Sequence, residues 1–340
     1  MENSILNKQY KFDFGFGDTR GIREIMMSHI PGKFLETDFG SYGYPPHVGN
    51  PELIEEVRDL IVDLTGKQYK HVLITNGATN ALNAYIYAAK NGITRTLITH
   101  PLYFMMYPGI AKLHGLEHKT SWSVNPSYYG GELGFVDSPN NPTGKLFTGP
   151  ICATGTVWDS SYHTPTYCGV RSNPGSKLKC IGVTPCHEAM AGSLSKLTGI
   201  NGLRVGWLAT DNDAIFQKAY HYVEHDLCGV SNPSQHAALQ ILKKVNLQEF
   251  YEDSKVLLDT NRDTLSRLNH IFSGQPIFPV GMYALFEVDS KLRDLLERAS
   301  VHTLDGRLIG DHRDSVRFNL ANSAKATKAM VNAILKEDKR

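Results

Sequence analysis

The middle of the chain alternates short apolar runs with helical patterns, and this alternation constrains the fold most. His71–Thr75 has the composition of a buried strand, Asn76 and Gly77 break it, and Ala78–Ala89 continues with a helical pattern. This order of elements is typical of an α/β domain. Further strands are expected at Thr96–Thr99, Gly134–Asp137 and Thr156–Asp159.

The last ~90 residues differ in character from the middle of the chain. They contain one long amphipathic helix over Tyr251–Ile271, strands near Met282–Val288 and Ser315–Asn319, and a C-terminal helix. We expect a large domain over residues 36–245 and a smaller α+β domain formed by residues 1–35 and 246–340. Other helices are expected over residues 53–64, 103–114, 213–223 and 234–245.

Charge and cysteine content exclude several classes of function. The 340 residues carry 35 basic and 34 acidic side chains, a net charge of +1, so no nucleic-acid partner is expected. The 14 histidines are dispersed through the sequence, which predicts no metal site. With no signal-peptide core and no stretch of membrane-spanning length, we expect a soluble, cytoplasmic protein. The five cysteines (152, 168, 180, 186 and 228) form no CxxC pair and are expected to be reduced thiols.

Lys196 is the most informative single residue. It lies among small and apolar residues, with Ser193 and Ser195 just before it and Arg204 eight positions later. Partial burial beside another cation lowers the pKa of a lysine, as a nucleophilic amine requires. The serines and the arginine could bind a dianion. The alternative is an ordinary solvated lysine.

Three further segments place polar groups after expected strands. Gly77-Ala78-Thr79 opens a helix whose free N–H groups could bind an anion, or it is an ordinary turn with a threonine cap. Residues 138–144 (SPNNPTG) form a rigid loop that could aim an amide side chain, or are a plain turn. Asp159 ends a strand three residues before Tyr162, where a lone Asp is often a helix cap. In open α/β sheets, ligands bind at these strand ends.

Together these segments resemble the fold-type I pyridoxal-phosphate enzymes, in the class I/II aminotransferase superfamily. The resemblance extends from about Gly17 to Asn319, with the motifs in the family's order. The sequences DSPNNP, WDSSYHTPTY and SKLTGINGLRVGW are nearest to the tryptophan aminotransferase/alliinase branch. The resemblance implies a large domain whose mostly parallel seven-stranded sheet lies between helices, a smaller α+β domain, and pyridoxal 5'-phosphate as cofactor.

The resemblance also implies a role for each catalytic position. Lys196 would hold the cofactor as a Schiff base and move a proton between the substrate Cα and the cofactor C4′. Asp159 would pair with the pyridine nitrogen, which makes the ring an electron sink. Tyr162 and Asn141 would hydrogen-bond the ring O3′. Tyr103 would stack on the ring face, or it is a core tyrosine.

The phosphate and the substrate have their own expected contacts. The phosphate is expected against Gly77, Ala78, Thr79, Ser193 and Arg204. In a homodimer, Tyr44 would reach a second subunit's phosphate, with Tyr42 as a rival. Arg317 matches the family's substrate-carboxylate arginine, Asn141 would also contact substrate, and Gly17 would lie near the site.

We therefore expect an aminotransferase that moves an amino group between an L-amino acid and a 2-oxo acid, and the resemblance favours an aromatic amino acid as donor. A C–S lyase or another elimination enzyme of the same fold is the alternative, because the bond cleaved depends on substrate pose and leaving group. A cofactor-free scaffold is a third possibility. The chain departs from the family in its length: only 17 residues separate Asn141 from Asp159, so the usual helix there is expected to be absent or very short.

Overall fold

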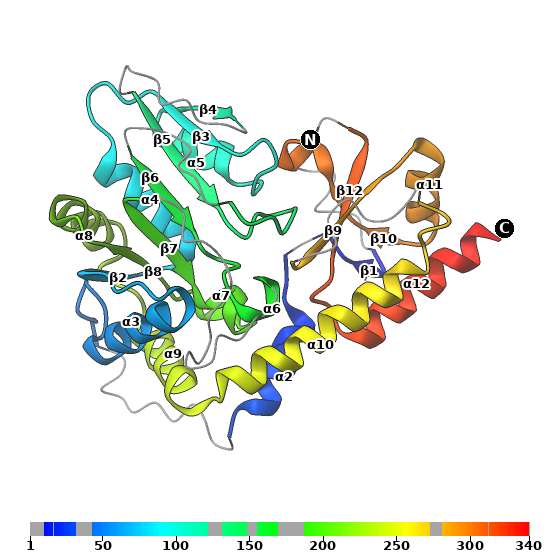
Figure 1. Cartoon of the computed structure of the whole chain (residues 1–340), viewed down its shortest axis with the longest axis horizontal. Helices are drawn as coiled ribbons and strands as arrows, with labels where there is room; N and C mark the ends of the chain where they lie inside the picture. Colours follow the sequence, from blue (N-terminus) through cyan, green and yellow to red (C-terminus); the bar gives the residue numbers. More distant parts are fainter. Residues whose placement is uncertain are drawn as a thin grey trace.

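The computed structural model describes residues 10–15, 17–31, 43–121, 131–147, 155–168, 187–272, 281–311 and 313–339. Within them, a large lobe surrounds a seven-stranded sheet and a smaller lobe surrounds a three-stranded sheet (Figure 1). A long helix at the lower edge of Figure 1, α10 (Leu247–Ser266), runs from the large lobe to the small one. We keep residues 36–245, and 1–35 with 246–340, as proposed domain boundaries.

The large sheet is mostly parallel, as the sequence predicts. Its strand order is β2-β8-β7-β6-β5-β3-β4, and only β8 runs antiparallel to its two neighbours. The expected strands at residues 71–75, 96–99 and 156–159 are confirmed without change. The strands are β2 (His71–Thr75), β3 (Thr96–Thr99), β4 (Glu117–Thr120), β5 (Glu132–Asp137), β6 (Thr156–Asp159), β7 (Ala189–Ser193) and β8 (Gly206–Thr210).

Both faces of this sheet are buried. Because side chains alternate along a strand, each strand contributes to two hydrophobic cores, one on either face of the sheet. In β2, Val72 and Ile74 join one core, and Leu73 joins the other. In β8, Trp207 and Leu208 divide in the same way. Because successive side chains of a strand point to opposite faces, continuous apolar strands need helices on both sides.

Helices cover these two faces. Asn50 caps the N-terminus of α3, and the left-handed Gly66 follows its last residue; Asn212 caps α8. Helices α4 and α8 pack against each other and against the sheet. The helices of this lobe are α3 (Pro51–Thr65), α4 (Gly77–Ala89), α5 (Tyr107–Leu113), α6 (Pro165–Cys168), α7 (Leu194–Leu197), α8 (Asp213–Leu227) and α9 (Asn232–Lys244), with the 3-10 turn η2 (Asn201–Leu203).

The smaller lobe joins both ends of the chain. The strand order of its sheet is β11-β12-β9, all antiparallel, and the N-terminal β1 pairs in parallel with β10. Helices α10 and α12 pack against each other below this sheet (Figure 1). The elements are β1 (Phe12–Asp13), α2 (Arg20–His29), β9 (Tyr283–Glu287), α11 (Ser290–Arg298), β10 (Val301–His302), β11 (Leu304–Asp305), η3 (Gly306–Ile309), β12 (Ser315–Asn319) and α12 (Ala324–Asp338).

Some boundaries differ from the sequence predictions. The helix expected from residue 103 begins at Tyr107, where Pro108 occupies the first turn. Helix α10 begins earlier than predicted, after the cap Asn246, and ends earlier, at Ser266. Residues 141–147 contain no helix, and residues 148–154 lie outside the described residues. Among the helices described, none combines the length and apolar character that crossing a membrane requires.

Candidate active site

A cavity of about 370 Å³ lies where β5, β6 and β7 end, facing the smaller lobe. The structure brings most of the predicted site residues into its lining. Three of them, Gly77, Tyr103 and Tyr44, are not in the lining. The predicted residues that do line the cavity are Gly17, Ala78, Thr79, Asn141, Asp159, Tyr162, Ser193, Lys196, Arg204 and Arg317.

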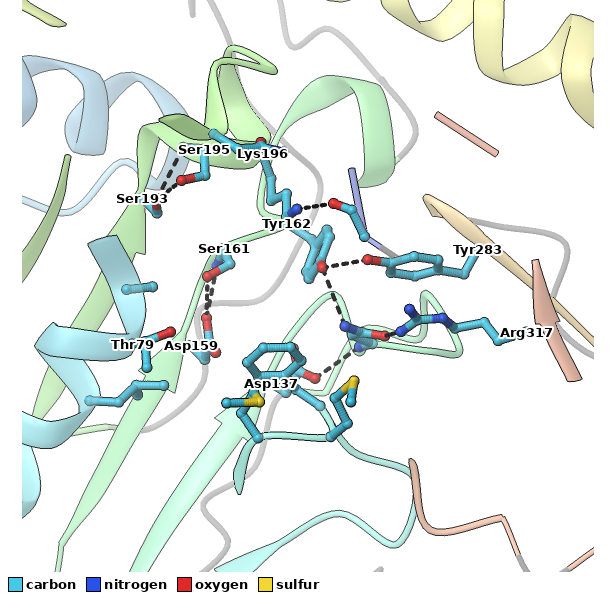
Figure 2. A pocket seen from close by; sticks show the side chains of 18 of the residues that line it. Thr79, Asp137, Asp159, Ser161, Tyr162, Ser193, Ser195, Lys196, Tyr283 and Arg317 are labelled. Carbon is cyan, nitrogen blue, oxygen red and sulfur yellow. Dashed lines mark hydrogen bonds between the residues drawn. The ribbon is translucent and has the colours of Figure 1, made fainter. Parts of the chain in front are cut away.

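Lys196 reaches into this cavity from the short helix α7, directly after β7 (Figure 2). Its Nζ donates a hydrogen bond to the backbone carbonyl of Gly17. Burial lowers the pKa of Lys196 to about 8; the charges of Arg317 and Arg204 act in the same direction, and Asp18 opposes them. A larger fraction of this amine is therefore unprotonated at physiological pH than for an exposed lysine, which favours its use as a nucleophile.

Two buried carboxyl groups lie side by side on the sheet edge. Asp159 ends β6, Asp137 ends β5, and the two are register partners. Burial raises the pKa of Asp159, although hydrogen bonds from Ser161 and Tyr107 oppose the shift. Burial, and then the charge of Asp159, raise the pKa of Asp137 well above its usual value. Asp137 is a site residue that sequence reasoning missed, although its position at a strand end was a usable signal.

Hydrogen bonds fix the orientation of Asp159. Tyr107 donates to its Oδ2 at 2.8 Å, and the backbone and hydroxyl of Ser161 donate to its Oδ1 at 3.0 and 2.7 Å. Within the described residues, neither Asp159 nor Asp137 makes an ion pair with a lysine or arginine. A buried carboxylate without a cation is costly, so this site is suited to a cationic ligand.

A group of donors that could hold an anion lines the same cavity. The N-terminus of α4 presents Ala78 and Thr79, and the hydroxyls of Ser193 and Ser195 lie 2.9 Å apart. Arg204 donates to the Ser195 hydroxyl at 3.3 Å. The arrangement combines backbone N–H groups, hydroxyls and one guanidinium, a combination that suits a phosphate.

Gly77 supports this anion site from outside the cavity lining. Its φ of +75° lies in the left-handed region, and a Cβ there would come within 2.5 Å of Arg204 Nη2. Glycine at this position therefore allows the guanidinium to lie against the first turn of α4. The structure thus shows a packing role for Gly77, and its contact with a phosphate stays a prediction.

Arg317 faces the cavity from the smaller lobe, on β12 (Figure 2). It donates to Asn141 Oδ1 at 2.7 Å and to the Gly15 carbonyl at 2.9 Å, and its buried Nε has no hydrogen-bond partner. Its guanidinium stacks 3.9 Å from the ring centre of Tyr283. Nη1 and Nη2 each carry a second N–H besides these bonds, so the guanidinium could donate to a carboxylate in the cavity that it lines.

Tyr283 is a second residue that the sequence did not indicate. Its hydroxyl lies 2.9 Å from the Tyr162 hydroxyl, which also accepts a hydrogen bond from Asn141 Nδ2 at 3.2 Å. A Cβ on Gly17 would come within 2.7 Å of the Tyr283 hydroxyl and 3.5 Å of Lys196 Nζ. Glycine at position 17 therefore leaves room for both groups.

The residue expected to stack on a cofactor ring, Tyr103, does not line the cavity, whereas its neighbour Phe104 does. Tyr103 packs edge-on against His118, with ring centres 4.8 Å apart, and lies outside the lining. Phe104, the next residue, lines the cavity and contacts Tyr107 edge-on at 5.6 Å. The aromatic ring that lines the cavity thus belongs to the residue after the predicted one. The apolar pattern of the sequence does not distinguish between two adjacent aromatic residues.

The expectation that Tyr44 reaches the phosphate of a second subunit stays a prediction. Tyr44 is 90% exposed and lies away from the cavity of its own chain, and its rival Tyr42 lies outside the described residues. The expectation that the histidines form no cluster is wrong for His221 and His225, which lie near Glu224 on α8. Helical spacing of three and four residues was the signal for that group.

Comparison with known proteins agrees with this geometry. A family model described as "Allinase" matches residues 46–272. The chain belongs to the alliinase family. Tryptophan aminotransferase-related protein 2 of Arabidopsis thaliana is 26% identical over 311 residues, covering 79% of the chain and 67% of that protein. Alliin lyase of Allium cepa var. aggregatum is 23% identical over 228 residues, 64% of the chain and 46% of the lyase.

Solved structures support the same fold. The aromatic aminotransferase of Pyrococcus horikoshii OT3 superposes with a TM-score of 0.76 at 18% identity, with 99% of each chain covered. A Thermus thermophilus aspartate aminotransferase variant gives 0.74 at 18% identity, covering 99% of this chain and 94% of that one. The fold is that of the fold-type I pyridoxal-phosphate aminotransferases.

Pyridoxal 5'-phosphate is the cofactor of this alliinase-family fold, and the residues present fit it. Lys196 offers a buried amine for the aldehyde. Asp159 offers a carboxylate without an ion-pair partner for the ring nitrogen. The group at Thr79, Ser193 and Arg204 offers the donors that a phosphate requires.

Proposed function

We propose that this alliinase-family chain is a pyridoxal-phosphate-dependent aminotransferase that moves an amino group between an L-amino acid and a 2-oxo acid. The observation that carries the proposal is that Lys196 and Arg317 face one cavity from opposite lobes, and that Asp159 also lines this cavity. An amino acid bound by its carboxylate to Arg317 would present its Cα toward Lys196.

Each residue then has a defined task. The cofactor, when bound, supplies the electron sink that stabilises negative charge at the substrate Cα. The Arg317 fork holds the substrate carboxylate, and Asn141 fixes that fork through its Oδ1. The Nζ of Lys196 would take up the substrate Cα proton and hold it for return to the reacting atoms. Asp159 holds the proton on the ring nitrogen.

The lining of the cavity favours an amino donor whose side chain is apolar or aromatic. Leu82, Phe104, Met105 and Met106 line the cavity, and methionine side chains adapt readily to flat rings. The relatives named for tryptophan aminotransferases support the same choice. We also propose a homodimer, in which the exposed Tyr44 contacts the phosphate of a second subunit.

A panel of amino acids tests the proposal. Each is added to the cofactor-loaded protein without and with a 2-oxo acid, and the absorbance of the bound cofactor is followed. Aromatic amino acids should convert the cofactor to its amine form, and a 2-oxo acid should restore it. If no amino acid produces this change, the proposal fails.

Elimination is the second candidate, because relatives of the chain include alliin lyases. The same Lys196 and Arg317 could serve it, since the leaving group on the substrate decides the bond that breaks. Pyruvate and ammonia formed from a substrate with a sulfur leaving group, without any 2-oxo acid, would favour the lyase over the transaminase.

A further inference from the structure

A group of metal-ligand side chains lies on helix α8, among the side chains that the catalytic proposal does not use. His221, Glu224 and His225 occupy positions i, i+3 and i+4, which place them on neighbouring parts of one helix face. One ligand atom from each lies within 4.8 Å of the others. The sequence His-Tyr-Val-Glu-His is thus a compact set of two imidazoles and one carboxylate.

Contacts from two directions hold the carboxylate in place. His47, 177 residues earlier in the chain, contacts Glu224 Oε1 through Nδ1 at 3.1 Å, and Tyr220 donates to the same oxygen at 3.2 Å. The other oxygen, Oε2, faces His221 Nδ1 at 3.3 Å and His225 Nδ1 at 3.9 Å. Carboxylates that bind metals are commonly oriented by such outer contacts.

We propose that His221, Glu224 and His225 form a site for a divalent transition-metal ion of the zinc class. Imidazole nitrogen and carboxylate oxygen are the ligands that zinc takes in sites with three protein ligands and one open position. Magnesium and calcium prefer sets of oxygen ligands, so a set with two imidazoles selects against them.

Metal binding requires side-chain rotations, because His225 Nδ1 lies 2.7 Å from the backbone carbonyl of His221. Ligands about 2.0–2.1 Å from a tetrahedral zinc ion lie about 3.4 Å from one another, so a set within 4.8 Å must contract slightly. The side chains of His221 and His225 are 57% and 77% exposed, and they can rotate without disturbing the core. Exposure also leaves the fourth position open to water.

A metal ion bound at this site would affect the segment around His47, which lies near the proposed subunit contact. His47 lies three residues after Tyr44, and a Cβ on Gly229, just beyond α8, would come within 2.9 Å of Pro45. Metal bound to Glu224 would therefore stiffen the carboxylate on which the segment around His47 rests. The proposal itself stands on the α8 residues and is independent of the catalytic function.

Zinc binding to the tag-free full-length protein, loaded with cofactor, tests the proposal. Zinc chloride is titrated in competition with a chromophoric chelator. We expect one ion per chain with a Kd of about 10 µM or tighter at pH 7.5. His221→Ala and His225→Ala should each weaken this binding at least about tenfold, and Glu224→Gln should weaken it as well.

Matched variants separate this site from other zinc ligands. Cys228, three residues after His225, is exposed, and His270 is an exposed histidine elsewhere. Cys228→Ser and His270→Ala should keep the wild-type affinity. Circular dichroism confirms that each variant is folded. Binding that survives in both His221→Ala and His225→Ala, or that is lost in Cys228→Ser, overturns the proposal, as does the absence of binding tighter than about 100 µM.

Discussion

Asp137 and Asp159 end neighbouring parallel strands as register partners, so two buried carboxyl groups lie next to each other at the base of the cavity. Two adjacent buried carboxylates do not both ionise easily. Asp159 has several donors that favour its ionised form, namely Tyr107 and Ser161. Burial and the charge of Asp159 raise the pKa of Asp137 well above its usual value, whereas these donors oppose the rise at Asp159, so Asp159 is the better suited of the two to carry the charge that a ring nitrogen needs.

Replacing Asp137 with asparagine tests this division of charge. The raised pKa of Asp137 means that the folded protein binds more protons than the unfolded chain above about pH 4. The Asp137 carboxyl group therefore makes the free energy of unfolding decrease as the pH rises. The stability of Asp137→Asn relative to wild type should increase between pH 4.5 and pH 7, by at most about 1.4 kcal/mol per pH unit. Urea unfolding at both pH values measures it, and a pH-independent difference would contradict the assignment.

Asp137→Asn and Asp137→Ala should also differ in activity. Asp137 Oδ2 accepts a hydrogen bond from the Asn141 backbone N–H at 2.8 Å, and Asn141 in turn holds Arg317. Asparagine keeps an acceptor there, whereas alanine leaves a buried N–H unpaired at a cost of about 1–3 kcal/mol. We expect KM for the amino acid to rise mainly in Asp137→Ala. Equal KM values in both variants would remove this positioning role.

Asp159→Asn should preserve shape while removing the charge opposite the ring nitrogen. Without that charge the ring is a weaker electron sink, so kcat should fall by about two orders of magnitude or more. Equilibrium dialysis should show weaker cofactor binding as well. Asp159→Glu is the control that keeps the charge. If Asp159→Asn retains the kcat and cofactor affinity of the wild type, the assignment is wrong.

Phe104→Ala and Tyr103→Ala separate the two candidates for the stacking ring. Phe104 lines the cavity, so its removal should weaken cofactor binding by about 1–3 kcal/mol, or roughly 5- to 150-fold. Tyr103 packs on His118 away from the cavity, and its replacement should leave the cofactor Kd within about twofold. Fluorescence titration of the cofactor-free variants measures both, and the opposite ranking would restore the sequence prediction for Tyr103.

Arg317→Ala and Arg317→Lys test carboxylate recognition. Loss of a buried charge partner should cost about 2–5 kcal/mol, which lowers kcat/KM for amino acids by about 30- to 5000-fold. Lysine keeps the charge but not the bidentate fork, so it should recover only part of the loss. If Arg317→Ala leaves kcat/KM unchanged for every amino acid, the carboxylate binds elsewhere.

The sequence was sufficient for the α/β architecture because the strands are short apolar runs with clear ends. His71–Thr75, Thr96–Thr99 and Thr156–Asp159 are found without change. Strands β7 and β8 were not anticipated, since Ala189–Ser193 and Gly206–Thr210 contain alanine and glycine and owe their strand form to pairing with each other.

Site residues were predictable where a motif fixes their spacing, as for Lys196, Asp159 and Tyr162. Tyr283 was not, because its place in the cavity depends on how the two lobes meet, whereas Asp137 was missed although it ends a predicted strand. Phe104 shows most plainly what the sequence alone does not determine. Adjacent aromatic residues in a loop have equal apolar character, and only the folded chain decides which one faces the cavity.

The covalent attachment of the cofactor to Lys196 tests the central claim most directly. The purified protein is supplied with pyridoxal 5'-phosphate, reduced with borohydride and digested, and the peptides are weighed by mass spectrometry. We predict one phosphopyridoxyl group per chain, on Lys196, and none on Lys196→Ala or on wild type reduced without cofactor. A protein that acquires no such group, or carries it on another lysine while Lys196→Ala remains fully active, would contradict the account.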